Sequence, residues 1–215
     1  MKKAILFFTG IVIVSSINCQ VIKLQAGKTF SKLDWKNQVT NTQTFKDVFI
    51  GNSAFLGIDY LFKNNYNLST NIGYVEKGGR NEVAEVDDNG IPTGKSILSE
   101  AQLNYYSFNT TVEYNYPLTD NFKPYFFGGP RIDYLYDYSQ DFNDLKSYDD
   151  LNLISYGCTF GAGFKITVSK IFLGVKAEYY LNLNKIASWD ANQTLKAGNI
   201  TDETFNVMLM LGVRL

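Results

Sequence analysis

The sequence predicts an all-β fold, an eight-stranded antiparallel up-and-down transmembrane β-barrel. Three observations support this prediction: several long segments alternate between apolar and polar residues, the connections between them alternate between short and long, and the N-terminus is typical of an exported protein. An alternation of period two is typical of a strand with one apolar and one polar face. Strands of about ten residues or more can cross a bilayer at a tilt of roughly 45°.

The longest predicted hairpin covers residues 103–138 and turns at residues 119–121. One face of its first arm consists of Tyr106, Phe108, Thr110, Val112, Tyr114 and Tyr116, opposite Ser107, Asn109, Thr111, Glu113 and Asn115. One face of its second arm consists of Phe122, Phe126, Ile132, Tyr134, Tyr136 and Tyr138, opposite Lys123, Arg131, Asp133 and Asp137. Both arms therefore combine an apolar face with a polar face.

Six further segments alternate in the same way, which brings the predicted number of strands to eight. They cover residues 21–33, 50–62, 66–76, 151–168, 171–183 and 204–215. Short connections are predicted near residues 63–65, 119–121 and 169–170, and long ones near 34–49, 78–98, 139–150 and 184–202. Lys77, Gly78 and Gly79 are interpreted as turn residues that begin the second long loop. Short turns on one side and long loops on the other are typical of outer-membrane barrels, with the loops outside the cell and both termini in the periplasm.

Residues 1–19 differ from the rest of the chain. Lys2 and Lys3 precede an apolar run over residues 4–14, and small and polar residues follow it. This pattern predicts a cleaved signal peptide over residues 1–19 and one outer-membrane β-barrel domain over residues 20–215. Lipidation of Cys19 is the alternative. No stretch reaches about 18 consecutive apolar residues, so no membrane-spanning helix is expected.

The composition restricts the partners. Charged residues make up 19% of the chain and the net charge is −1, so no basic surface is expected to bind nucleic acid. Aromatic residues, with 16 Phe and 15 Tyr, gather near predicted strand ends, as in the interfacial girdles of membrane barrels. The expected partners are outer-membrane lipid, the barrel-assembly machinery and an extracellular ligand on the loops. The barrel is expected to be a monomer.

Alternation alone does not decide whether the apolar faces meet lipid or line the interior of a soluble carrier barrel. The polar faces are rich in Gly, Ser, Thr and Asn, which favours a crowded lumen with lipid outside. The charges on these faces are expected to pair across the lumen, and eight strands leave an interior that side chains fill. The proposed charge network consists of Asp59, Glu113, Arg131, Asp133, Lys165, Lys176, Glu178 and Arg214, with Lys23 on the same face.

The sequence offers few groups for catalysis. It contains no His, which removes the common general base, so we predict neither an enzyme nor a cofactor. Carboxylates are frequent at residues 87–88 and 141–150, where oxygen ligands for calcium are conceivable. The stretch DDNGIPTG lacks the ligand spacing of an EF-hand loop, so solvated acidic loops are the favoured interpretation.

Five segments resemble the small outer-membrane β-barrel family of Bacteroidota that includes PorT. KLQAGKTFSKL is similar to its first strand, LSTNIGYVEKGGR to its third, LNYYSFNTTVEYNYPL and FKPYFFGGPRIDYLY to its fourth and fifth, and VKAEYYLNL to its seventh. The resemblance implies an outer-membrane location and eight strands, and it transfers no catalytic residues. The terminal Leu215 departs from the aromatic residue on which many outer-membrane barrels end.

Together these observations predict an outer-membrane barrel with a structural or loop-mediated binding role that is not an open diffusion porin. One alternative is a component of a PorT-like secretion or assembly machine. The other is a soluble periplasmic carrier barrel for an apolar ligand.

Overall fold

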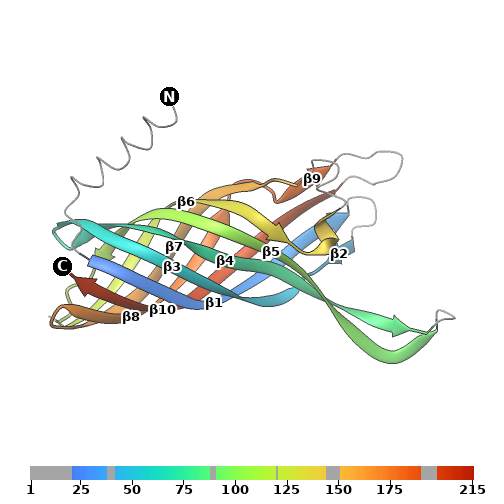
Figure 1. Cartoon of the computed structure of the whole chain (residues 1–215), viewed down its shortest axis with the longest axis horizontal. Helices are drawn as coiled ribbons and strands as arrows, with labels where there is room; N and C mark the ends of the chain where they lie inside the picture. The colour runs from blue at the N-terminus through green and yellow to red at the C-terminus, as the bar shows by residue number, and fades with distance from the viewer. Residues whose placement is uncertain (1–20, 38–41, 88–90, 120, 144–150, 190–197) are drawn as a thin grey trace.

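Eight long strands close into a barrel in the computed structural model, which describes residues 21–37, 42–87, 91–119, 121–143, 151–189 and 198–215 (Figure 1). Each is antiparallel to its neighbours, and β1 pairs with β10 from Val21 opposite Arg214 to Asn37 opposite Gly198, which closes the ring. The barrel strands are β1 (Val21–Asn37), β3 (Asp47–Lys63), β4 (Tyr66–Val86), β5 (Pro92–Asn115), β6 (Phe122–Tyr138), β7 (Ile154–Val168), β8 (Ile171–Asn182) and β10 (Gly198–Arg214). The predicted fold class and number of barrel strands are confirmed.

The two ends of the barrel differ. The short β3–β4, β5–β6 and β7–β8 turns lie with the C-terminus at one end, here called the turn end (Figure 1). The opposite end, the loop end, carries the longer connections, and these contain the short strands β2 (Thr42–Thr44) and β9 (Ala187–Trp189) and the 3₁₀ turn η1 (Gln140–Phe142). Within the described residues, no helix combines the length and hydropathy that a membrane crossing needs. The predicted signal peptide over residues 1–19 lies outside the described residues.

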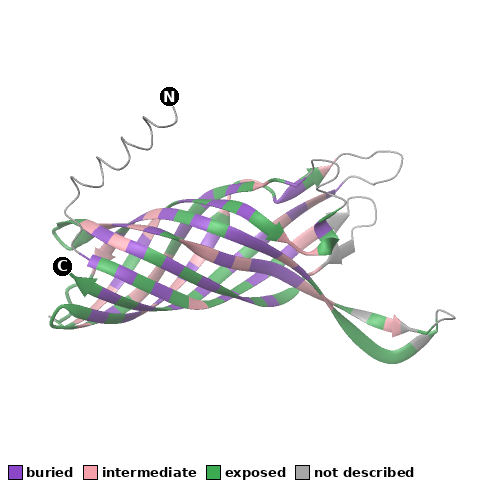
Figure 2. Ribbon diagram, viewed as in Figure 1, coloured by how far each residue is buried: buried purple, intermediate pink, exposed green. Residues whose placement is uncertain are grey.

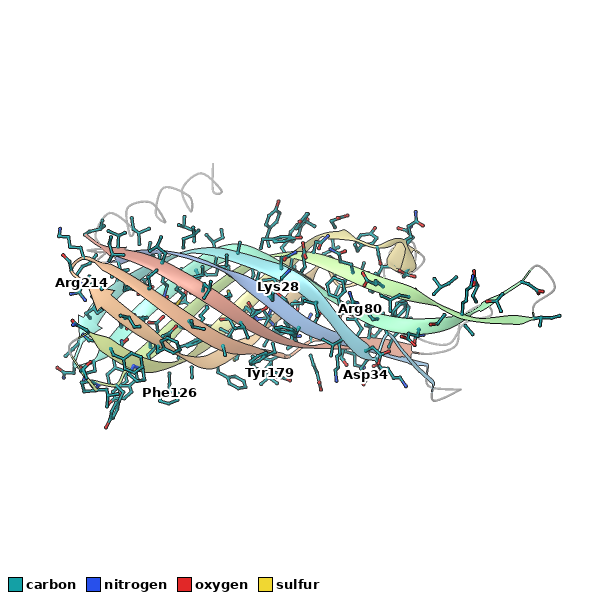
Figure 3. The ribbon with its side chains drawn as sticks, turned by 90° about the horizontal axis from the view of Figure 1, so that it is seen from below. Lys28, Asp34, Arg80, Phe126, Tyr179 and Arg214 are labelled. Carbon is teal, nitrogen blue, oxygen red and sulfur yellow. The ribbon has the colours of Figure 1, made fainter. Side chains whose placement is uncertain are left out.

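The apolar face of each strand points outward. In β1, Ile22 and Leu24 are exposed while Lys23 and Gln25 are buried, and Figure 2 shows the same alternation of buried and exposed residues around the barrel. Side chains such as Phe126 and Tyr179 project from the outer surface of the wall (Figure 3). A soluble carrier would place its apolar face around the interior, so the observed orientation is contrary to that alternative.

The second predicted long loop is wrong. Residues 78–86 continue β4 and residues 92–98 belong to β5, so the two strands form a hairpin that extends past the barrel at the loop end (Figure 1). Gly78 and Gly79 are strand residues where backbones approach closely: a Cβ at Gly79 would lie 2.2 Å from the Phe45 carbonyl oxygen. These glycines therefore satisfy a packing constraint rather than forming a turn. The last strand also begins at Gly198, earlier than predicted.

Apolar side chains fill the interior at the loop end. This upper cluster joins β1, β5, β6, β9 and β10 to η1 and to the segment before β7, with Trp35 and Trp189 packed against it. Its fully buried members come from loops as well as strands, so described parts of the connections pack inside this end of the barrel. The upper cluster consists of Leu33, Ala101, Leu103, Tyr105, Leu135, Phe142, Leu151, Ile186, Ala187 and Ile200.

Candidate functional site

Four buried charges meet across the lumen in the half nearer the turn end. Lys23 on β1 places its Nζ 2.6 Å from Oδ1 of Asp59 on β3 and 3.0 Å from Oε1 of Glu113 on β5. The Nζ of Lys165 on β7 lies 2.6 Å from Oε2 of Glu113 and 3.9 Å from Oδ2 of Asp59. Two cations and two carboxylates therefore form a neutral lower quartet that links four strands across the barrel.

A second group of charges lies nearer the loop end. The Nζ of Lys77 on β4 is 2.9 Å from Oδ2 of Asp133 and 3.2 Å from Oδ2 of Asp202. Arg131 donates hydrogen bonds to Asp133 and to the Asn182 side-chain oxygen. We call Lys77, Arg131, Asp133 and Asp202 the upper quartet. Because β4, β6 and β10 are not neighbours, its contacts also span the lumen.

One ion pair lies along the β8 wall. Lys176 donates to Glu178 at 2.9 Å, and Glu178 also accepts hydrogen bonds from Tyr180 at 2.8 Å and Asn206 at 3.2 Å. The Lys176 ammonium group lies 5.2 Å from the centre of the Phe127 ring. This pair is therefore held by polar and aromatic side chains from three strands.

Amide side chains occupy the space beside the lower quartet. Gln25 donates to Asn71 at 2.7 Å, and Asn71 donates to Asn109 at 2.7 Å. Asn67 donates to Glu113 at 3.1 Å. The last contact connects Asn67 to the lower quartet, while Gln25 Oε1 and Asn109 Nδ2 have no hydrogen-bond partner among the described residues.

The interior charges balance. Five cations (Lys23, Lys77, Arg131, Lys165, Lys176) face five anions (Asp59, Glu113, Asp133, Glu178, Asp202), and all ten are buried. A charge in a low-dielectric interior is costly unless a partner of opposite sign lies close to it. Each of these ten described charges lies within 4.0 Å of a charge of opposite sign, so the described interior charges compensate one another.

The structure places seven of the eight predicted network residues in the lumen: Asp59, Glu113, Arg131, Asp133, Lys165, Lys176 and Glu178. Arg214 is the exception, because it is the last residue of β10 and is exposed at the turn end (Figure 3). Two lumen charges were missed, Lys77 and Asp202, since both were assigned to loops. The alternation of the sequence could have identified both. Lys77 lies an even number of positions from the inward-facing Asn71, and so does Asp202 from the inward-facing Asn206.

Metal binding finds no support among the described residues, where no group of three His, Cys, Asp or Glu side chains is suited to hold an ion. Asp87 accepts a hydrogen bond from the Ile91 amide at 2.9 Å, and Asp141 accepts one from Ser139 at 3.0 Å. These carboxylates therefore serve local turns. Asp88 and the carboxylates over residues 144–150 lie outside the described residues.

Comparisons with known proteins agree with this architecture. The sequence profile described as "Outer membrane protein beta-barrel domain" matches residues 21–188. The outer membrane protein OprG from Pseudomonas aeruginosa is similar in fold, with a TM-score of 0.52, 11% identity and coverage of 92% of this chain and 97% of that chain. The N-terminal β-barrel domain of P. aeruginosa OprF (TM-score 0.48, 10% identity, 92% and 98% coverage) and Escherichia coli outer membrane protein W (0.48, 14%, 92% and 98%) also match. No curated protein matches the chain significantly.

Proposed function

Because the chain belongs to the outer membrane protein beta-barrel family, we propose that it is a closed barrel that binds a protein partner outside the cell through its β4–β5 hairpin. The family places the chain in the outer membrane. In that setting the outward apolar faces meet lipid and the loop end faces the exterior. The proposal has two parts, a lumen that does not conduct and a projecting hairpin that binds.

The filled lumen supports the first part. An eight-stranded barrel has an interior that side chains just fill, and here the two quartets and the upper cluster occupy successive levels of it. Planar-bilayer recording on the refolded full chain tests this part. We expect at most small, rare openings, whereas large, steady, ohmic channels would contradict it and indicate a porin.

The unpaired edges of the hairpin support the second part of the proposal, binding of a partner. Beyond Arg80 opposite Glu100, the described residues of β4 and β5 pair only with each other, because the pairing of β3 ends at Asp47 and that of β6 at Tyr138. Both outer edges of this two-stranded ribbon therefore present free backbone donors and acceptors. A two-stranded ribbon is marginally stable alone in water, and adding a strand satisfies its edge.

The charge of the hairpin indicates the chemistry of the partner. Residues 80–100 contain five acidic side chains and two basic ones, and exposed Ile91, Ile97 and Leu98 add apolar surface. An extended segment that alternates basic and apolar residues matches both properties. We therefore infer that the partner contributes such a segment by strand addition.

Peptide binding tests this inference. The probes are a fluorescent decapeptide of alternating Lys and Val and a matched peptide of alternating Glu and Val, measured by anisotropy against the full chain in detergent. We expect the Lys peptide to bind, the Glu peptide to fail, and Glu82→Lys combined with Glu85→Lys to weaken the Lys peptide. Equal binding of both peptides, or binding unchanged by deletion of residues 82–98, would contradict the inference.

A role in a secretion or assembly machine is the second candidate. The resemblance of five segments to the PorT-containing family of Bacteroidota supports it, and the hairpin would then dock a component of that machine. Deletion of the gene followed by assay of secreted proteins tests this role, and unchanged export would count against it.

A further inference from the structure

A cavity of about 270 Å³ lies at the turn end of the barrel. Asp59 and Lys165 of the lower quartet belong to its lining, and so do Lys63, Lys123 and Arg214 from the ends of β3, β6 and β10. We call this cavity the turn-end vestibule. We propose that the vestibule binds an anion of the phosphate class, which goes beyond the binding role of the hairpin at the opposite end.

The charges around the vestibule do not balance as they do deeper in the lumen. Asp59 and Lys165 are compensated within the lower quartet, by Lys23 and Glu113. Within the described part of the chain, Lys63, Lys123 and Arg214 form no ion pair with a carboxylate. The lining therefore carries three cations in excess, supplied by β3, β6 and β10, so positive charge faces the space from several directions.

Phosphate chemistry fits this arrangement. A phosphate group has several oxygens that accept hydrogen bonds from different sides at once, Arg binds it in a bidentate manner, and Lys acts as a point charge. Asn64 and Asn65, both with positive φ in the β3–β4 turn, add polar groups to the same lining. Lys63 and Arg214 are exposed and Lys123 is half-buried, so salt screens their attraction for an anion and binding should be strongest at low salt.

Two sources offer this chemistry, a free phosphate and the phosphate of a lipid headgroup. The first experiment tests the free ion: inorganic phosphate is titrated calorimetrically at low salt into the full chain in a maltoside detergent, which contains no phosphate. We expect saturable binding that weakens about tenfold or more in the double variant Lys123→Ala/Arg214→Ala, since each lost contact is a charge-assisted hydrogen bond. The matched control, Lys32→Ala/Lys46→Ala, removes two exposed cations at the loop end and should leave affinity unchanged.

The second experiment tests the lipid. Native mass spectrometry compares retention of phosphatidylglycerol with that of diacylglycerol, which has the same chains and no phosphate. The site is assigned to a lipid headgroup if the protein retains phosphatidylglycerol but not diacylglycerol. This retention should be lost in Lys123→Ala/Arg214→Ala and kept in Lys32→Ala/Lys46→Ala. Binding of inorganic phosphate with the same dependence assigns it to the free ion. If neither probe binds, or if the vestibule variant binds as the control does while both keep the heat-modified gel shift of a folded barrel, the proposal is overturned.

Discussion

The lower quartet fills its part of the lumen with ion pairs, and the upper cluster fills the loop end with apolar side chains; these two regions are here called the charged and the apolar closure. In the lower quartet, each of four charges depends on partners on particular strands, such as Glu113 with Lys23 and Lys165. In the upper cluster, side chains such as Leu103 and Ile200 are excluded from water without specific directional contacts. Removing one charge leaves its partners without a counter-charge in the low-dielectric interior, whereas removing one methylene group reduces the buried apolar area only slightly. The two closures should therefore respond very differently to single substitutions.

The largest effect is expected from Glu113→Ala. This change leaves Lys23 and Lys165 sharing only Asp59, so one buried cation has no full partner. Breaking a buried ion pair by removing one partner costs about 3–5 kcal/mol, and we expect the free energy of unfolding in lipid vesicles to fall by that amount. Urea unfolding followed by heat-modified gel migration measures it.

The matched control for this change is Glu100→Ala, which removes an exposed carboxylate from the hairpin and should cost less than about 1 kcal/mol. Equal losses in the two variants would show that the lower quartet does not hold the barrel together. Bilayer recording on the folded Glu113→Ala protein should show little conductance, because the upper quartet and the upper cluster still fill the lumen.

The next largest effect is expected from a charge placed on the lipid-facing side of the barrel wall. Val175 on β8 faces outward between the buried residues Gly174 and Lys176. Val175→Arg should cost about 2–4 kcal/mol, because it places a charge in hydrocarbon near the middle of its strand. Ile171→Arg at the turn end of the same strand should cost about 0–1 kcal/mol, since its charge reaches the interface. Similar losses at both positions in the same unfolding assay would argue against a membrane around β8.

The strands and the orientation of their faces were predictable because lipid imposes the alternation. Segments such as residues 171–183 meet hydrocarbon on one side and a polar lumen on the other, so period two is strict. The rule fails beyond Arg80, since the described side chains of the projecting hairpin are exposed or half-exposed on both faces and no apolar face is required. Lys77 was assigned to a loop for a related reason: two glycines follow it, and they were interpreted as turn residues although they allow close backbone packing.

The upper cluster was not predictable from the pattern at all. Its members include Phe142 and Ile186, which belong to connections outside the eight barrel strands, and their burial depends on how these connections fold back into the lumen. Asp202 differs, since it shares the inward parity of Asn206 and was missed only because the last strand was predicted to begin after it. Contacts that depend on loop conformation have no period in the sequence.

A small core change tests the apolar closure. Ile200→Val removes one methylene group from a fully buried side chain and should cost about 0.5–1.5 kcal/mol. The two Trp residues of the chain, Trp35 and Trp189, both pack against the upper cluster, so Trp fluorescence reports this region directly. Ile166→Val on the lipid-facing wall is the control and should leave the Trp emission unchanged. A loss as large as that expected for Glu113→Ala would show that the two closures do not differ as argued.

The smallest effect is expected in the hairpin, because it projects from the barrel and none of its described residues beyond Arg80 belongs to the lower quartet or the upper cluster. The Nε of Arg80 lies 2.6 Å from Oε1 of Glu100, with 32% and 38% of the two side chains exposed. A surface pair of this kind contributes about 0.2–1 kcal/mol and is screened by salt, so Arg80→Ala should leave unfolding of the barrel unchanged. Amide exchange in the hairpin beyond this pair should accelerate by about fivefold at most, because the local opening free energy falls by the same small amount. Exchange within β1 and β10 serves as the internal control, and acceleration there would show that the hairpin and the barrel open as one unit.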